Sequence, residues 1–587
     1  MANLGHEIAL SDIRNTIRSL FIRSLWSFGA SFLLLVVFAL LFSTKGALGH
    51  IFQFCIARIV FEVRKFPLFG VREIDIQNVA YHYAKIMHEL GFWKIDLGFA
   101  AVTFLASFIF LSYFFFKKGQ RAGLEHVMRG NRLSTTRLHN RIMKSDADFS
   151  TLLLGKDAVL IPEYLQYLHF AFLGASGCGK STAIEQIIAH ALNRKQKALI
   201  VDLNGSFYSK FGRASDHVLS LRDPRSHAWD FWCEKGMEAE NMAAAMIEAG
   251  AEHNQYFWKG ARAVLASLLK YTKNCDELWE EFKSSTENIR KKLEDQNEIA
   301  QRIIGQGDGD QADGILGSAV LDFSFLKELN QWCSSEDKKF TITEWMNKND
   351  DSSFVYLIVS DKDLEISKPL LRVWFDLACL AALNRDPLDE NHKHTWLIID
   401  ELKSIGQLPS LPAILDKGRK YKATVALGFQ AISQIQKIYG EQDARSILQG
   451  VQNQFYFRMN ETESAQYASD ALGEQELEQA NLGVSFGQKS GSDRGSINKT
   501  STRKKVVLPD EIRSLKNLEC YAKLCHHQPF KMEFAVTKRE RIQEPAQSKI
   551  NHEHVIGKKA PTKEIAPETE VIEAPQWLPG VPPRVST

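Results

Sequence analysis

Residues 168–203 read LHFAFLGASGCGKSTAIEQIIAHALNRKQKALIVDL, and this stretch decides the fold. A short apolar run at 168–173 enters the glycine-rich turn GASGCGKS at 174–181. A helical pattern follows over 182–192, and a second apolar run occupies 198–203. An apolar strand, a helix and another apolar strand are typical of a βαβ unit with parallel strands. The sequence therefore predicts an α/β fold whose first crossover begins at the glycine-rich turn.

The turn matches the nucleotide-binding pattern GxxxxGK[ST], and it lies between a strand and a helix, where the chemistry requires it. Glycines let successive backbone N–H groups wrap around phosphates, and the amino end of the next helix adds positive potential. Lys180 is placed to reach the β- and γ-phosphates of ATP, and the Ser181 hydroxyl to bind Mg²⁺. We predict nucleotide contacts from Gly174, Ala175, Ser176, Gly177, Cys178, Gly179, Lys180, Ser181 and Thr182.

A second motif, WLIIDE, ends in a pair of carboxylates at Asp400 and Glu401. The strand predicted over 395–399 runs directly into this pair. Asp400 is placed to hold Mg²⁺ together with Ser181, and Glu401 to polarise the attacking water. Acidic residues often end strands, so the motif has little weight alone. Its presence in one chain with a phosphate-binding turn predicts that the protein hydrolyses ATP.

Two further candidate residues lie downstream, and the residues alone leave both open. Arg419 would enter a neighbouring subunit's site and neutralise transition-state charge, worth roughly 10³–10⁵ in rate in NTPases. Its alternative is a solvated arginine beside Lys417 and Lys420. Gln430 closes the strand predicted over 424–429 and would sense the γ-phosphate or orient water. Its alternative is an ordinary polar residue at a strand end.

The rest of the soluble part divides by its hydrophobic pattern. Helical stretches dominate residues 236–334 and β-branched alternation is scarce there, which predicts an all-alpha domain. Strand patterns return afterwards, so the predicted nucleotide-binding domain is discontinuous, at 121–235 and 335–540. A Gly/Ser-rich patch at 483–496 indicates a surface loop. Residues 541–587 lack apolar periodicity and are rich in proline, which is typical of a disordered tail.

Two long apolar runs without charge precede all of this, at about 25–42 and 97–116. Each has about 20 residues, or roughly 30 Å as a helix, which matches the thickness of a bilayer core. Two such runs with charges only at their edges predict two transmembrane helices. Residues 1–120 would form a membrane anchor, with a small external loop domain at 43–96.

Basic residues flank the two runs and predict their orientation. After the second run the only acid before Asp146 is Glu125, against Lys117, Lys118, Arg121, Arg129, Arg132, Arg137, Arg141 and Lys144. ATP is cytoplasmic, so the nucleotide motif supports the same orientation, with both termini in the cytoplasm. The basic stretch favours contact with lipid headgroups beside the membrane, and DNA is the alternative.

Composition excludes several other classes of protein. The 587 residues suggest about four folding units. With 45% hydrophobic and 24% charged residues the chain is neither wholly disordered nor collagenous. A net charge of +2 gives no general case for nucleic acid, so a basic surface would have to be local. Cys520 and Cys525, followed by two histidines, invite a zinc interpretation, but their spacing and alternation favour a strand.

The order of these motifs resembles the conjugative coupling proteins of type IV secretion, the TraD/TraG/TrwB family, and its TraD members most. The resemblance runs from the membrane segment to about residue 535. Its more specific parts are WLIIDEL, GRKY, GFQAISQ with YGE, and LPDEIRSLKNLECY, at 396–402, 418–421, 428–434 with 439–441, and 508–521. Asp202, Gly205 and Phe207, with 222–224 and 228–231, look like the family's second-strand segment.

The resemblance implies a RecA-like P-loop domain in a homo-hexameric ring on the inner membrane, with the all-alpha domain at the cytoplasmic end. Such a ring receives single-stranded DNA with relaxase and relaxosome proteins and passes it to the secretion channel. Carried onto this chain, it makes Lys180 and Ser181 the Walker A residues, Asp400 and Glu401 the Walker B pair, Arg419 the trans-acting arginine and Gln430 the glutamine of the downstream motif.

The sequence therefore predicts a membrane-anchored ATPase coupling protein that uses ATP and Mg²⁺ to drive single-stranded DNA into a conjugation channel. The tail departs from the family, because it is shorter than F-type TraD tails, rich in proline and not strongly acidic. Specificity for a relaxosome is therefore not transferred. Three alternatives stay open: a coupling ATPase that recruits protein effectors, an FtsK-type DNA pump, and a non-catalytic ATP-binding docking scaffold.

Overall fold

The computed structural model describes residues 126–250, 255–295, 341–485 and 494–546, together with Ile109 and single residues or short stretches between 300 and 340. The chain divides into two compact units, Met1–His126 with Glu478–Ser501, and Val127–Leu477 with Thr502–Thr587. The predicted membrane spans and the external loop lie outside the described residues, apart from Ile109. Among the described residues, no helix has the length and apolar character needed to cross a bilayer.

A ten-stranded sheet organises the described part of the second unit, in the order β2-β15-β14-β11-β5-β10-β9-β6-β8-β7. Neighbouring strands from β11 to β7 run parallel, whereas β14 pairs antiparallel with β11 and β15. The carboxyl ends of the parallel strands therefore meet at one edge. The strands are β2 Ser134–Thr135, β5 Phe170–Leu173, β6 Lys197–Leu203, β7 His217–Leu219, β8 Phe354–Val359, β9 Thr395–Ile399, β10 Ala423–Phe429, β11 Asn453–Tyr456, β14 Glu519–Leu524 and β15 Phe530–Glu533.

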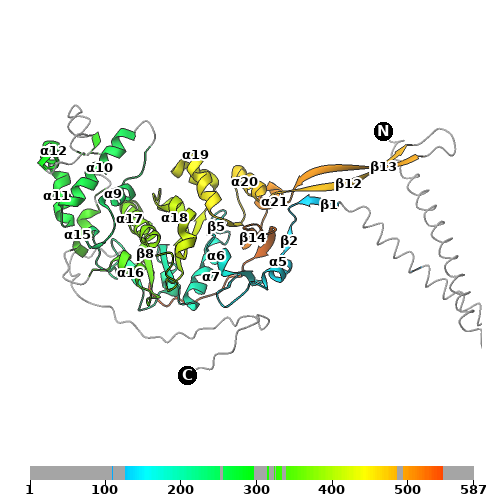
Figure 1. The fold of residues 1–587 in the computed structure, drawn as a ribbon, viewed down its shortest axis with the longest axis horizontal. Coiled ribbons are helices and arrows are strands. Elements are labelled where there is room, and N and C mark those ends of the chain that lie inside the picture. The colour runs from blue at the N-terminus through cyan, green and yellow to red at the C-terminus, as the bar shows by residue number, and fades with distance from the viewer. Residues whose placement is uncertain are drawn as a thin grey trace, which may run out of the picture. The chain divides into compact units, whose positions relative to one another are not determined.

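Continuous apolar runs explain why the central strands lie inside the molecule. Every residue of β5, β8, β9 and β10 is buried, as expected for parallel strands that are covered on both faces. Alternate residues divide between two apolar clusters, so that Val425 and Leu427 of β10 pack in one and Ala426 packs in the other. Helices therefore cover both faces of the sheet, which confirms the predicted α/β fold (Figure 1).

Two groups of helices make these layers. The face that includes Ala426 is covered by α5 Thr136–Met143, α7 Lys180–Asn193 and α8 Tyr208–Phe211, with the short hairpin β3 Leu152–Leu154 and β4 Val159–Ile161. The opposite face is covered by α17 Leu364–Leu383, α18 Leu411–Lys417, α19 Ile432–Gly450 and α20 Thr462–Leu472. The short helices α6 Glu163–Gln166 and α21 Pro509–Arg513 lie before β5 and β14.

Further helices are inserted between β8 and its neighbour β7, the edge strand of the sheet. They are α9 Ala239–Met246, α10 Gln255–Tyr271, α11 Cys275–Lys283, α12 Thr286–Asp295, α15 Leu326–Cys333 and α16 Ile342–Asn347. Regular structure described between 236 and 334 is helical throughout. The apolar core of these helices is continuous with the core of the sheet, because Val264 and Leu268 of α10 belong to the same apolar cluster as Leu357 of β8.

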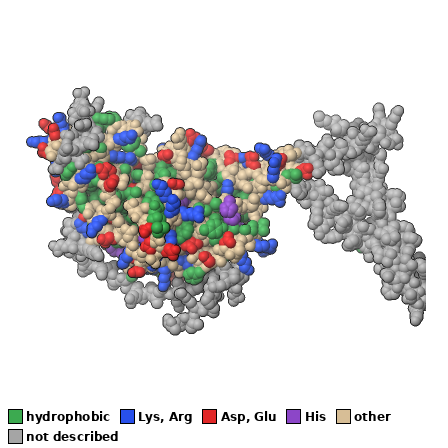
Figure 2. Space-filling view, viewed as in Figure 1, with side chains coloured by type: hydrophobic (Ala, Val, Ile, Leu, Met, Phe, Trp, Pro, Cys, Tyr) green, Lys and Arg blue, Asp and Glu red, His purple; other side chains and the backbone are tan. Residues whose placement is uncertain are grey.

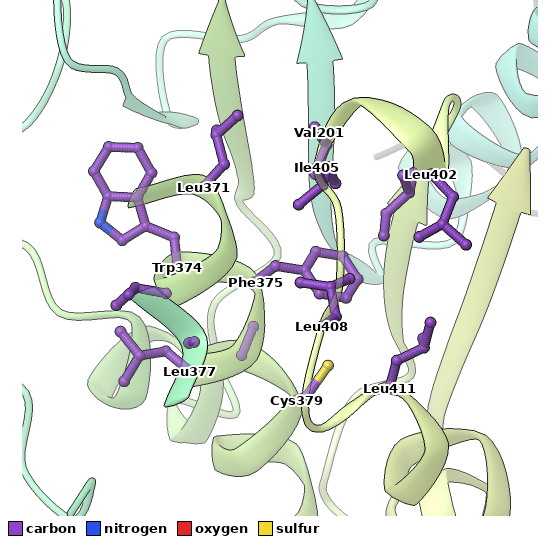
Figure 3. Close-up of a cluster of buried hydrophobic side chains, with 14 of the residues drawn as sticks. Val201, Leu371, Trp374, Phe375, Leu377, Cys379, Leu402, Ile405, Leu408 and Leu411 are labelled. Carbon is purple, nitrogen blue, oxygen red and sulfur yellow. The ribbon is translucent and has the colours of Figure 1, made fainter. Parts of the chain in front are cut away.

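The segment that follows β9 is held by an apolar cluster. Leu402, Ile405, Leu408 and Leu411 recur at every third position, and all are buried. Figure 3 shows them beside Phe375 of α17. This segment contains the short 3₁₀ helix η3 Leu402–Ser404 and leads into α18, so residues just beyond the sheet edge have a fixed backbone.

Two predictions about loops need correction. The Gly/Ser-rich patch at 483–496 is not a loop throughout, because its two ends belong to the strands β12 Glu474–Ser485 and β13 Arg494–Lys505. These strands form a separate sheet with β1 His126–Gly130, in the order β1-β12-β13. The first residues of the predicted tail are also placed, since Ile542 N donates to Ser209 O at 2.8 Å and Ala546 N to Asn204 O at 3.1 Å.

Candidate active site

The glycine-rich turn joins β5 to α7 and places its backbone at the carboxyl edge of the sheet. Gly177 and Gly179 have φ of +72° and +117°, in the left-handed region that favours glycine. Gly174 N donates to Phe429 O of β10 at 3.1 Å, so the turn is tied to the neighbouring strand where it begins. The turn therefore has the local geometry that the sequence predicts.

Lys180 is buried inside the turn, with its side chain folded back over the loop. Its ammonium group donates to Gly174 O at 2.7 Å and to Ala175 O at 3.1 Å. These carbonyls hold the positive charge within the turn. Ser181, the next residue, is exposed at the start of α7. A cation inside the turn and a hydroxyl at its mouth are what binding of a metal-bound polyphosphate requires.

Two residues that the sequence analysis missed hold the turn from outside. Ala175 N donates to Arg458 O at 2.8 Å, just beyond β11, and Leu518 N donates to Cys178 O at 2.8 Å. A Cβ on Gly179 would lie 2.9 Å from Leu518 Cδ2, so this contact also requires glycine. Leu518 lies within the stretch 508–521 that marks the family resemblance, but that stretch carries no chemistry that would assign it this role.

Asp400 and Ser181 meet across the sheet edge. Ser181 Oγ donates to Asp400 Oδ2 at 2.6 Å. Asp400 Oδ1 is buried and has no hydrogen-bond partner among the described residues. Burial raises the pKa of Asp400, while the Ser181 hydrogen bond and the charge of Lys180 oppose the rise. The approach of β10 depends on Gly428, because a Cβ there would lie 2.0 Å from Asp400 O.

Glu401 pairs with the candidate glutamine of the next strand. Gln430 lies directly after β10, and its Nε2 donates to Glu401 Oε2 at 2.7 Å. The other carboxylate oxygen, Oε1, is buried and has no partner in the described part of the chain. Burial raises the pKa of Glu401, and the hydrogen bond from Gln430 opposes it. The structure thus brings together Lys180, Ser181, Asp400, Glu401 and Gln430, which sequence analysis selected from three separate motifs.

These side chains fit a Mg²⁺ ion. Mg²⁺ prefers oxygen ligands, usually one or two from the protein with the rest from water and phosphate. Ser181 and Asp400 supply a hydroxyl and a carboxylate that already converge, and Asp400 Oδ1 is a buried acceptor without a donor. A buried polar atom without a partner calls for an explanation, and a bound ion is one.

Arg419 lies elsewhere on the same chain. It is exposed on the 3₁₀ turn η4 Gly418–Tyr421, which precedes β10, whereas Gln430 follows β10. The seven residues of β10 separate the two by about 23 Å. Arg419 therefore lies at the amino edge of the sheet, and within one chain the structure does not bring it to Lys180 or Asp400.

Two other groups that the sequence analysis named have structural surroundings. Asp202, at the end of β6, accepts hydrogen bonds from Phe207 N at 3.1 Å and Tyr208 N at 2.7 Å, and burial raises its pKa to about 6. Cys520 is buried on β14, and no group of three or more potential metal ligands occurs in the part of the chain that the structure describes.

Curated relatives of the chain include a protein that is named as a coupling protein. The coupling protein TraD of Escherichia coli (strain K12) is 27% identical over 445 residues, which cover 72% of this chain and 60% of TraD. Protein VirD4 of Agrobacterium fabrum is 22% identical over 396 residues, which cover 62% of this chain and 58% of VirD4. The chain thus spans about three fifths of the length of these relatives.

Solved structures of the plasmid coupling protein TrwB have the same fold. TrwB in complex with ADP and Mg²⁺ has a TM-score of 0.62 and 23% identity over 72% of this chain and 97% of that one. TrwB with a non-hydrolysable ATP analogue has a TM-score of 0.61 over 71% and 96%. The chain therefore shares its α/β fold with TrwB. Residues 157–534 match the family model described as the type IV secretion-system coupling protein DNA-binding domain, so the chain belongs to the type IV secretion-system coupling protein family.

Proposed function

We propose that the protein is an inner-membrane ATPase that couples single-stranded DNA to a type IV secretion channel. The observation that carries the proposal is the convergence of Lys180, Ser181, Asp400 and Glu401 at one sheet edge. Two buried carboxylate oxygens there have no partner in the described part of the chain. A scaffold that bound the nucleotide without hydrolysing it would need Lys180 and the Ser181 hydroxyl to hold the phosphates and Mg²⁺. It would have no use for Glu401, whose free oxygen has the chemistry of a general base.

The chain's own groups divide the work. Backbone N–H groups of the turn surround the phosphates, and Lys180 exchanges its two carbonyl partners for phosphate oxygens. Ser181 and Asp400 would hold Mg²⁺, which would neutralise phosphate charge when bound. Gln430 holds Glu401 Oε2, so that Oε1 is left to orient a water and accept its proton. The raised pKa of Glu401 makes this carboxylate a better proton acceptor.

Arg419 acts in a neighbouring subunit under this proposal. Its exposed place at the amino edge supports a role in trans, because there it faces away from its own nucleotide site. A homo-hexameric ring would bring the Arg419 of one subunit to the carboxyl edge of the next. ATP would then lie at subunit borders, with Lys180, Asp400 and Glu401 on one side.

The remaining assignments rest on the family and on the sequence. The matching domain is described as DNA-binding, and the relatives are named as coupling and conjugal transfer proteins. We assign two membrane spans at about 25–42 and 97–116, with both termini cytoplasmic. Relaxase and relaxosome proteins would deliver the DNA, and type IV secretion channel components would receive it. The domain bounds stay as the sequence predicts them, at 121–235 with 335–540 and at 236–334.

The test is ATP hydrolysis by the full chain in lipid nanodiscs, measured across protein concentration with and without single-stranded DNA. We expect DNA to raise the rate, and Lys180→Ala and Arg419→Ala each to lower it by about 10³-fold. The matched control is Arg445→Ala, another exposed arginine, whose guanidinium group donates to Glu441 Oε1 one helical turn away at 3.0 Å. This control should hydrolyse ATP at the normal rate.

Mixing the two inactive variants tests the role in trans. Lys180→Ala subunits keep an intact arginine, and Arg419→Ala subunits keep an intact nucleotide site. A mixture should therefore hydrolyse ATP faster than the sum of its parts. A rate that ignores DNA would favour transport of protein effectors or a docking scaffold. A mixture with no gain, while sizing shows that the subunits assemble, would exclude the arginine in trans.

A further inference from the structure

Helix α5 has one face that packs on the domain and one that does not. Thr136, His139 and Met143 are buried, with His139 Nε2 3.0 Å from Leu160 O and its ring 4.7 Å from that of Phe530. The other side is exposed. We define the α5 face as the exposed basic and apolar side chains Leu133, Arg137, Leu138, Arg141 and Ile142.

The apolar side chains of the α5 face are about half exposed to solvent. Leu133, Leu138 and Ile142 are 46%, 47% and 54% exposed. Leu138 and Ile142 lie four residues apart, and therefore on one side of the helix. Figure 2 shows basic and hydrophobic side chains together near the end of the sheet where Figure 1 labels α5 and β2. Clustered exposed apolar side chains mark an interaction surface more often than isolated ones do.

The charge of the α5 face is not compensated locally. Arg137 and Arg141 make no hydrogen bond or ion pair with any residue that the structure describes. No aspartate or glutamate occurs between residues 126 and 145. Within the described part of the chain, the α5 face therefore combines guanidinium groups that make no hydrogen bond or ion pair with aliphatic side chains that are exposed to solvent.

We propose that the α5 face docks on the surface of an anionic membrane. Arg137 and Arg141 bind lipid phosphates, and Leu138 and Ile142 enter the boundary between headgroups and acyl chains, as basic amphipathic helices do. The aliphatic side chains favour lipid over DNA. Nucleic acid offers phosphates to the arginines, but single strands are held by stacking on aromatic rings, and the α5 face has none.

The chain length fits this occupant. The second predicted span ends at residue 116, and α5 begins at Thr136. The nineteen residues that separate the span from α5 reach at most about 68 Å when fully extended, so the chain is long enough for α5 to meet the bilayer surface. The proposal rests on the membrane anchoring in the proposed function and is independent of ATP hydrolysis.

Docking through α5 would also orient the nucleotide-binding domain. α5 lies beside β2 and β15, at one edge of the ten-stranded sheet, and the helical insertion follows β7 at the other edge. Nine strand spacings put these edges about 43 Å apart. A docked α5 would hold the sheet edge-on to the membrane, with the insertion pointing into the cytoplasm.

The test uses the full chain in nanodiscs of phosphatidylcholine alone or mixed with phosphatidylglycerol. An environment-sensitive fluorophore is attached at Ile142→Cys, and lipids brominated in their acyl chains serve as the quencher. The matched probe site is Leu388→Cys, because Leu388 is 86% exposed on the turn after α17. The chain without an added cysteine, labelled in the same way, gives the background from native cysteines.

We expect a severalfold stronger quenching at Ile142→Cys in anionic discs than in neutral ones, and no lipid dependence at Leu388→Cys. Arg137→Glu with Arg141→Glu should abolish the difference. Arg290→Glu with Lys291→Glu, two exposed residues on α12, should preserve it. Equal quenching of the Ile142→Cys probe in both lipids would overturn the proposal.

Single-stranded DNA added to neutral discs separates the two kinds of partner. A shift of the Ile142→Cys probe with DNA, but not with phosphatidylglycerol, would assign the α5 face to nucleic acid and overturn the membrane proposal. Fluorescence does not depend on catalysis. An inactive protein whose probe still responds to anionic lipid would therefore count against the proposed ATPase and support the docking.

Discussion

The two ends of the central strands carry buried polar groups of opposite character. At the carboxyl end, Asp400 Oδ1 and Glu401 Oε1 are buried and have no partner among the residues that the structure describes, and burial raises the pKa values of both carboxyl groups. At the amino end, His394 Nε2 lies 2.8 Å from Thr424 Oγ1 and its Nδ1 lies 3.4 Å from Gln196 Nε2. The carboxyl end leaves carboxylate oxygens without partners. The amino end joins most of its groups to each other, although the neutral amide oxygens Gln166 Oε1 and Asn453 Oδ1 also lack partners among the described residues.

The amino end is a hydrogen-bonded network. Trp396 Nε1 donates to Gln196 Oε1 at 2.7 Å, and Thr424 Oγ1 donates to Gln166 O at 3.1 Å. His169 Nδ1 accepts from Val425 N at 3.0 Å. Burial lowers the pKa of His169 to about 4, so this imidazole is neutral at physiological pH.

The difference shows how a buried polar group can be assigned to structure or to function. A group whose partners come from its own chain is satisfied when the protein folds, and its removal affects stability. A buried carboxylate that folding leaves without a partner is far more costly than a neutral amide oxygen, so it points to a ligand that folding does not supply, and its removal affects binding or catalysis. The carboxyl end belongs to the second kind, which agrees with the nucleotide site proposed there.

The largest effect is expected at Glu401. Glu401→Gln keeps the shape of the side chain but removes the proton acceptor, so we expect kcat to fall by about 10²–10⁴-fold. Affinity for ATP should change little, because the phosphates contact the turn. Steady-state hydrolysis and binding of a fluorescent ATP analogue measure the two quantities. Normal hydrolysis by Glu401→Gln would show that another group activates the water.

The next largest effect concerns the pH dependence of stability at the amino end. The folded-state pKa of His169, about 4, is below the ordinary value of 6.5. Between these values the unfolded chain binds a proton that the folded chain does not, so the free energy of unfolding decreases as pH falls from 6.5 to 4. The shift corresponds to about 3 kcal/mol. His169→Gln keeps an acceptor for Val425 N and should lose about that much less stability over this range.

Denaturant unfolding at pH 7 and pH 4 measures this difference. His526→Gln is the control, because that histidine is exposed. It should follow the unmodified chain. Asp202 and Asp376 have pKa values raised to about 6 by burial and act in the opposite direction, but they are present in every variant and cancel. Equal acid sensitivity of His169→Gln and the unmodified chain would mean that His169 is protonated in the folded state.

The sequence predicts the central strands and the residues that follow them well, but it does not reveal contacts between distant segments or strands that are largely polar. β9 has the predicted bounds, and β5, β6 and β10 differ from prediction by one or two residues, because buried parallel strands are apolar throughout. The candidate Walker residues could be selected from the sequence because each of their motifs follows such a strand. Arg458 and Leu518 were missed because only pairing of distant strands brings them to the turn. The strands at 474–485 and 494–505 were missed because they are largely polar.

A smaller effect on stability is expected at Thr424, near the start of β10. Thr424→Val preserves the shape of the side chain but leaves His394 Nε2 and Gln166 O without their partner. We expect the free energy of unfolding to fall by about 2 kcal/mol. Hydrolysis per folded molecule should be unchanged. Denaturant unfolding and the rate at saturating ATP measure both, and a slower rate with normal stability would contradict a structural role.

The smallest effect is expected at Gln430, just past the other end of the same strand. Gln430→Ala removes the donor to Glu401 Oε2 and lets the carboxylate turn, so kcat should fall about tenfold, equivalent to about 1.4 kcal/mol. Stability should hardly change, because Gln430 donates to a carboxylate that lies partly in solvent. The same two measurements then give opposite results for two positions six residues apart on one strand. If both variants lost stability and kept their rate, the two strand ends would be equally structural, and free buried acceptors would not mark the site.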